Sequence, residues 1–109
     1  LVLRATVKVR HQSLSGGGYL SSEFPLMIRI TYRDAYDSQA EWVRGFYYQN
    51  VAGNPTTYGE EIAADQWFPF ESPNLLEHIP RPTRIVAIRI YASGWDYDSL
   101  ISDVSLIAE

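Results

Sequence analysis

The stretch "LVLRATVKVR" at residues 1–10 decides the fold class, because its side chains alternate strictly in character. From residue 3 onward, apolar side chains fall on the odd positions and polar ones on the even positions. Successive side chains of a β-strand point to opposite faces, so this pattern predicts a strand with one buried and one solvated face.

The same period of two recurs along the chain, in "FPLMIRITYR" (24–33), "RIVAIRIYA" (84–92) and "VSLIA" (104–108). Glycine-, serine- and proline-rich segments separate these stretches, and no helical period of adequate length is present. Strands without helices to cover a parallel sheet favour an all-β fold, an antiparallel β-sandwich.

Composition narrows the class of protein. The 109 residues fit a single domain (1–109), and the chain opens directly on a strand, so we expect a domain cut from a longer envelope or secreted protein. A net charge of −4 disfavours nucleic acid as a partner. The absence of cysteine excludes disulfides, thiolate nucleophiles and cysteine-ligated zinc. The short apolar runs predict no membrane insertion.

The stretch "EWVRGFYYQN" (41–50) breaks the alternation. A glycine inside a strand often marks a β-bulge, so we predict a bulge at Arg44–Gly45. The bulge would turn Val43, Phe46 and Tyr48 inward. It would leave four side chains facing outward: Trp42, Arg44, Tyr47 and Gln49.

Three stretches together resemble a known group: "SGGGYLSSEFPLMIRITYRD", "EWVRGFYYQN" and "IRIYASGWDYDSLISDVSLIAE". They are similar to the jelly-roll sandwich of galactose-binding-like domains and carbohydrate-binding modules, and to sandwich domains of bacterial FecR-type envelope proteins. The resemblance implies a jelly-roll topology and a non-catalytic module in the cell envelope or outside the cell. It also implies a structural calcium.

Catalysis is not expected. His11 and His78 are far apart and have no recognisable nucleophile or metal-spaced partner. Carboxylates are numerous, but most stand in loop-type sequence, and the chain is small for a glycosidase cleft.

A calcium site would need several oxygen ligands. The segment "DYDS" (96–99) offers two carboxylates, and Glu23, Asp103 and Glu109 are the residues that could join them in the fold.

Aromatic residues are the richest signal, with three tryptophans and eight tyrosines. Sugar rings stack on aromatic faces, and their hydroxyls need directional partners such as Arg or Gln. Pro69 predicts an edge strand or a loop, and not a central strand, beside Trp67, which makes that ring a rim candidate. Trp95 is expected to plug the sandwich. The predicted ligand-binding set is Arg29, Trp42, Tyr47, Gln49, Trp67, Arg89 and Tyr91. Cross-strand pairing for ordinary stability is the alternative explanation of the same residues.

Outward-facing basic residues form a further set: Arg4, Lys8, Arg10, Arg29, Arg33 and Arg89. They either pair with acidic residues across strands or meet an anionic partner. The favoured function is a non-catalytic module, extracellular or in a bacterial envelope, that binds carbohydrate or another envelope polymer. The alternative is a structural or assembly domain that packs against neighbouring domains or copies of itself through the same face.

Overall fold

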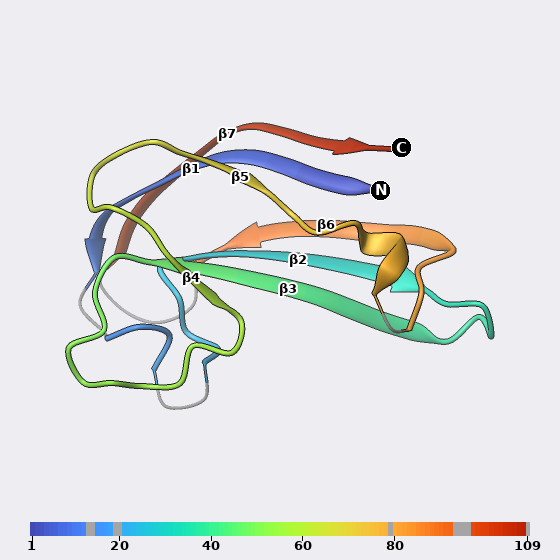
Figure 1. Ribbon diagram of the computed structural model, residues 1–109, viewed down its shortest axis with the longest axis horizontal. Helices are drawn as coiled ribbons and strands as arrows, with labels where there is room; N and C mark the ends of the chain where they lie inside the picture. The colour runs from blue at the N-terminus through green and yellow to red at the C-terminus, as the bar shows by residue number, and fades with distance from the viewer. Residues whose placement is uncertain (13–14, 19–20, 79, 93–96, 109) are drawn as a thin grey trace.

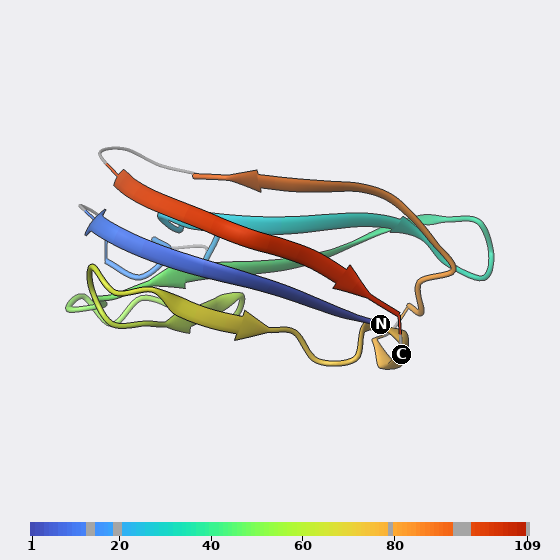
Figure 2. The same ribbon diagram turned by 90° about the horizontal axis from the view of Figure 1, so that it is seen from above.

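In the computed structural model, two β-sheets pack face to face as a sandwich (Figures 1 and 2). The structure describes residues 1–12, 15–18, 21–78, 80–92 and 97–108. In chain order, the elements of this part are β1 (Val2–Gln12), β2 (Leu26–Arg33), β3 (Gln39–Tyr47), β4 (Gly59–Glu61), β5 (Phe68–Glu71), the 3₁₀ turn η1 (Leu75–Glu77), β6 (Arg84–Tyr91) and β7 (Tyr97–Ile107). One sheet has the order β5-β1-β7 and the other β4-β3-β2-β6.

The alternation read from the sequence forms the core between these sheets. Leu3, Val7 and Val9 of β1 are fully buried, and they face Ile28 and Ile30 of β2 across the sandwich. All strand pairs are antiparallel except β3 and β4, which run parallel. The prediction of an all-β sandwich is therefore confirmed. No helix in the described part of the chain is long and apolar enough to cross a membrane.

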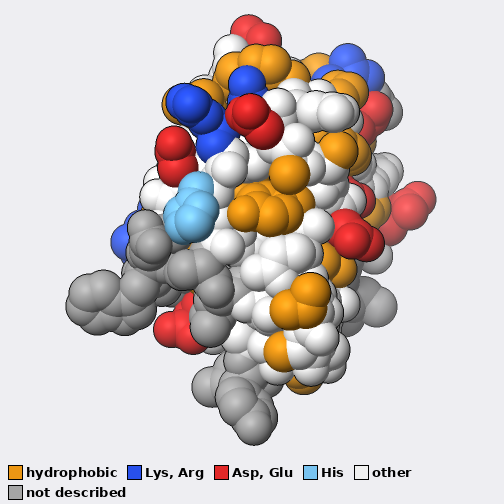
Figure 3. Space-filling model, turned by 90° about the vertical axis from the view of Figure 1, so that its left-hand side faces the viewer, with side chains coloured by type: hydrophobic (Ala, Val, Ile, Leu, Met, Phe, Trp, Pro, Cys, Tyr) orange, Lys and Arg blue, Asp and Glu red, His pale blue; other side chains and the backbone are white. Residues whose placement is uncertain are grey.

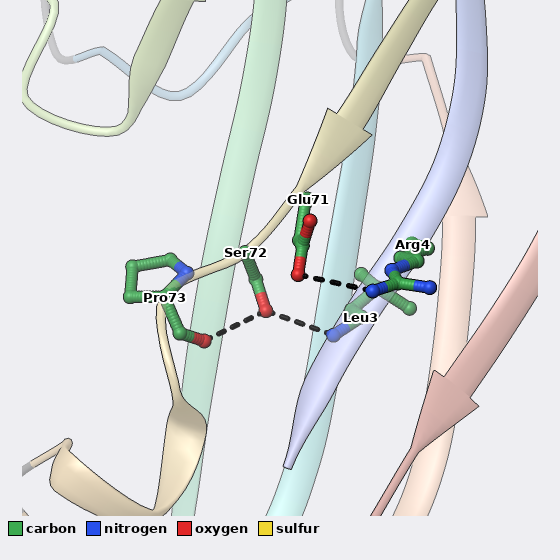
Figure 4. A network of polar contacts seen from close by, with 5 residues as sticks. All are labelled: Leu3, Arg4, Glu71, Ser72 and Pro73. Carbon is green, nitrogen blue, oxygen red and sulfur yellow. Dashed lines mark hydrogen bonds and ion pairs between the residues drawn. The ribbon is translucent and has the colours of Figure 1, made fainter. Parts of the chain in front are cut away.

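A polar clamp ties the start of β1 to the end of β5 (Figure 4). The Leu3 N–H donates to the Ser72 Oγ at 2.8 Å, and the Ser72 N–H donates to the Leu3 carbonyl at 2.8 Å. The Ser72 hydroxyl in turn donates to the Pro73 carbonyl at 2.9 Å. The exposed pair Arg4–Glu71, at 3.4 Å, adds little stability. The clamp extends the pairing beyond the last residue of β5 and so fixes where the following segment begins.

The edge-strand prediction for β5 is confirmed. Among the described strands, β5 pairs with β1 alone, and Pro69 stands within it. Proline is tolerated there because one side of an edge strand has no partner to receive an N–H. Trp67, just before β5, is 49% exposed, as its position at the rim predicts.

The bulge predicted at Arg44–Gly45 is wrong. β2 and β3 pair in unbroken register from Leu26↔Phe46 to Arg33↔Gln39. Register shifts occur instead between β1 and β7 and between β2 and β6. Regular alternation therefore places the side chains of Trp42, Arg44 and Phe46 on the core side of β3. Tyr47 takes the outer side, as predicted, and Val43 and Gly45 share that side.

Gly45 is needed because an aromatic ring occupies the space where its side chain would be. Phe24 is fully buried on the outer face of the four-stranded sheet, next to Met27 and Tyr47. A Cβ added to Gly45 would lie 2.2 Å from the Phe24 ring, and one added to Gly17 would lie 2.3 Å from it. The glycines thus form a cage in which a ring covers bare backbone, an arrangement known to stabilise strand glycines.

Gly45→Ala tests this explanation. Because the new methyl group would overlap the Phe24 ring, we expect a loss of about 1–3 kcal/mol in the free energy of unfolding. Urea denaturation measures it. In the Phe24→Ala background the same substitution should cost much less, and equal costs in both backgrounds would contradict the cage.

Candidate functional site

A cleft of about 530 Å³ opens beside β3, and it is larger than the hollow of about 310 Å³ beside β1 and β5. A second hollow of about 250 Å³ shares three lining residues with the cleft, Trp42, Pro73 and His78. The cleft is lined by Glu41, Trp42, Val43, Arg44, Thr57, Tyr58, Pro73 and His78.

The cleft exists because β4 covers only one end of β3. β4 pairs with the last three residues of β3, from Gly45↔Gly59 to Tyr47↔Glu61. Along its preceding half, β3 pairs with β2 on one side and has no partner strand on the β4 side in the described part of the sheet. The far wall of the cleft is the segment around η1, which the clamp at Ser72 holds in place. Tyr58 stands at the rim: its carbonyl accepts from the Gly45 N–H at 2.7 Å, while the residue remains 50% exposed.

Arg44 is the unusual residue of the cleft. It was predicted to face outward, but regular pairing turns it to the core side. Its guanidinium carbon lies 5.6 Å from the Trp42 ring and 5.8 Å from the Phe70 ring, within cation–π range. Its Nε is buried without a hydrogen-bond partner, and no hydrogen bond or ion pair joins its side chain to another described residue. Donors are therefore available to a molecule that enters the cleft.

Trp42 is the floor of the cleft and not an exposed platform. The prediction that it faces outward is wrong: it is 6% exposed and stacks on Phe70 with 6.4 Å between ring centroids. The physical reason is the absence of a bulge, which shifts each side chain before Gly45 to the opposite face. An indole this deeply buried cannot present its flat face to a ligand.

Three predicted ligand-binding residues do meet, on the outer face of the four-stranded sheet. Arg29 and Arg89 are directly opposed across β2 and β6, and each guanidinium lies 5.4 Å from the Tyr91 ring. The Arg29 Nε lies 3.7 Å from a Glu41 oxygen. Tyr47 shares this face, but it is only 9% exposed because Phe24 packs on it at 5.9 Å.

The remaining two predicted residues lie elsewhere. Trp67 is next to the three-stranded sheet, where the Lys8 ammonium lies 5.5 Å from its ring. Gln49 stays in the loop network at one end of the sandwich, where its Oε1 accepts from the Ser15 hydroxyl at 3.2 Å. Figure 3 views this end and shows small, separate hydrophobic patches among charged and polar groups. The visible, described part of it offers no continuous apolar platform. The seven predicted residues therefore form no single site.

Two of the residues predicted for calcium, Glu23 and Asp103, are described by the structure and lie apart. Glu23 lies next to the start of β7, where its carbonyl accepts from the Tyr97 hydroxyl at 2.6 Å. Asp103 is six residues further along β7, in a shallow hollow with Arg4 and Glu71. Glu109 and the Trp95 segment lie outside the described residues. Within the described ranges, no group of three or more His, Asp or Glu side chains could hold a metal.

Two tyrosines have raised pKa values. Burial, and then the nearby Asp34 carboxylate, raises the pKa of Tyr32, whose hydroxyl donates to the Pro80 carbonyl at 2.7 Å. Burial, and then Glu23, raises the pKa of Tyr97. Both hydroxyls are protonated hydrogen-bond donors near neutral pH, so they belong to the structure of the sandwich and not to acid–base chemistry.

Sequence reasoning did not single out Tyr58, Glu41 or His78 as ligand-binding. Each stands in or next to a segment whose sequence is typical of an ordinary loop or strand. Only the three-dimensional fold brings these segments to the half of β3 that β4 does not cover. No family model, curated protein or solved structure matches this chain, so the choice of a candidate site rests on the geometry of the cleft.

Arg44→Met distinguishes a structural from a binding role for this arginine. Methionine keeps the contacts with the two rings and removes a charge that has no hydrogen-bond partner. We expect the free energy of unfolding to stay within about 1 kcal/mol of the wild-type value, or to rise. Trp42→Ala, the comparison variant, should lose about 3–5 kcal/mol. A loss above about 2 kcal/mol for Arg44→Met in urea denaturation would show that the arginine holds the fold together.

Proposed function

We propose that this protein is a non-catalytic binding module that takes a carbohydrate chain into the cleft beside β3. One observation carries the proposal: at the cleft, half-exposed Tyr58 at the rim lies near the inward-turned Arg44, whose side chain has no hydrogen-bond partner among the described residues. Clefts that combine an apolar surface with a few convergent polar groups are the usual form of a ligand site.

The chemistry of the lining suits a sugar. The exposed Tyr58 ring can stack on the CH face of a sugar ring. Arg44 offers hydrogen-bond donors, Glu41 offers acceptors, and His78 can act as either. Trp42 contributes an apolar floor, which excludes water from these hydrogen bonds. The proposed site therefore keeps the kind of ligand expected from the sequence but replaces most of the expected residues.

The resemblance to galactose-binding-like domains supports the wider setting of this proposal. A jelly-roll connectivity, a location outside the cell or in a bacterial envelope, and an envelope polymer as partner all remain predictions that rest on it. The same holds for a structural calcium and for neighbouring domains of a longer chain.

Removing the two key side chains of the cleft tests carbohydrate binding. On a glycan array, followed by titration with the best glycan, Tyr58→Ala and Arg44→Met should each weaken binding by about tenfold, equal to about 1.4 kcal/mol. The loss follows from a missing stacking surface in one variant and missing donors in the other. Tyr36→Ala is the matched control, because Tyr36 is an almost fully exposed tyrosine in the β2–β3 turn.

The control variant should bind like the wild type. Equal weakening by Tyr36→Ala would show that the cleft is not the site. Failure of the wild-type protein to be retained by any glycan or insoluble polysaccharide would refute the proposal.

A second function, assembly through the open side of the sandwich, is favoured by an exposed apolar edge. β6 and β7 each end their sheet, and both lie on the same side of the molecule (Figure 2). Ile88 and Ile90 face the core side of β6, opposite Ile30 and Ile28, yet they are 38% and 39% exposed. Exposed apolar side chains on a strand edge are typical of a surface that pairs with another chain.

Self-association tests this alternative. If the edge pairs copies of the chain, light scattering on a sizing column should show a mass that rises with concentration. Ile88→Lys should return the protein to monomer, because a charge at that position would be buried on pairing. Val51→Lys, at a highly exposed loop position, is the control. A constant monomer mass for the wild type would exclude assembly through copies of itself.

A further inference from the structure

The outer face of the four-stranded sheet carries an unusual arrangement of charge. Two pairs of arginines are directly opposed across β2 and β6: Arg29↔Arg89 and Arg33↔Arg84. Between the pairs lie Thr31 and Ala87, which are also directly opposed and have small side chains. All four arginines point away from the core, because Arg29 and Arg33 alternate with the buried residues of β2 and their partners on β6 share the same face.

Like charges directly opposed across an antiparallel pair destabilise a sheet. Here the arrangement occurs twice, in a chain whose net charge is −4. Four of the nine lysines and arginines stand on this one face. Glu41 is the one acidic residue that forms a salt bridge with any of the four among the described residues, at 3.7 Å from Arg29. Folding therefore gathers four positive charges on this face, and among the described residues one carboxylate forms a salt bridge with them.

The guanidinium groups of this face are held by contacts other than hydrogen bonds to carboxylates. Tyr91 lies in cation–π range of both Arg29 and Arg89, which holds these two groups next to one ring. Arg33 donates from Nη1 to the Asp37 carbonyl at 3.1 Å, a contact that leaves its charge unpaired. The Nε atoms of Arg29 and Arg33 are buried and have no hydrogen-bond partner. Unpaired buried donors are costly, and an anion bound at the accessible nitrogens of the same guanidinium groups would offset part of this cost.

We propose that this arginine face, defined by Arg29, Arg33, Arg84 and Arg89, binds a linear anionic polysaccharide. The two pairs are four residues apart along β2, which corresponds to about 13 Å. A carboxylate or sulfate can bind at each pair, while the polymer between them crosses the small side chains of Thr31 and Ala87. The face is built from residues that do not line the cleft, so experiments can test this site and the cleft independently.

Charge density favours a polysaccharide over nucleic acid. Duplex DNA carries one charge per about 1.7 Å of axis, and proteins that bind it neutralise many phosphates at once. Two arginine pairs about 13 Å apart, on a net acidic domain, match a polymer with sparse anions.

Binding to polygalacturonate, a polysaccharide with one carboxylate per sugar, tests the inference. We expect immobilised polygalacturonate to retain the wild-type protein at about 50 mM salt, with affinity falling steeply toward about 200 mM. Neutral dextran should not retain it. The double variants Arg29→Gln/Arg89→Gln and Arg33→Gln/Arg84→Gln should each weaken binding by about tenfold or more, because each removes one anion position.

The matched control is Arg4→Gln/Arg10→Gln, which removes the same charge from the other sheet. It should bind nearly as well as the wild type, and so should Tyr58→Ala. Equal weakening by the control would show that binding depends on net charge and not on this face. Equal weakening by Tyr58→Ala would show that the polymer binds in the cleft. Either result overturns the inference. Tighter binding to a short duplex DNA than to polygalacturonate at the same salt, or no binding to polygalacturonate, would overturn it too. Thermal unfolding of each variant confirms that it is folded.

Discussion

The register of β2 between its two neighbours is the constraint on which both candidate surfaces depend. Side chains alternate with a period of two, so a slip of one residue would move every side chain of a strand to the opposite face. The observed register with β3 places Arg44 in the cleft and Gly45 beneath Phe24. The register with β6 opposes the two pairs of arginines. The ring of Phe24 helps to fix this register, since a Cβ brought to the position of Gly45 by a slip would overlap it.

The strands were predictable from the sequence, because alternation is a local signal that each segment carries by itself. The edge position of β5 was predictable for the same reason, since Pro69 excludes a partner on one side whatever the rest of the fold. Gly45 shows the limit of such reasoning. A bulge and a ring packed on bare backbone both require glycine in a strand, and the ring comes from Phe24, some twenty residues away. The wrong choice between them inverted the predicted facing of Trp42 and Arg44.

The candidate site was less predictable than the fold because it is assembled from distant segments. Tyr58 reaches β3 through a backbone hydrogen bond to Gly45, and His78 follows η1 on the far wall. Neither contact leaves a pattern in the local sequence. The paired arginines were visible as basic residues on alternate positions, but their direct opposition depends on a register that includes an irregularity between Thr31 and Tyr32. Whether a segment forms a strand depends on its own sequence, whereas which side chains share a surface depends on how the strands pair.

Glu41 links the two surfaces and gives them a physical relation. It lines the cleft, and it supplies the salt bridge of the arginine face through Arg29. At 3.7 Å and with both side chains partly exposed, that ion pair is weak, so an anion bound at Arg29 and Arg89 competes with it at small cost. In the proposed carbohydrate site, a carboxylate released from Arg29 would be free to accept hydrogen bonds from sugar hydroxyls. Under the two proposals, Glu41 is therefore the residue through which binding at one surface would change the other, while each surface keeps its own binding residues.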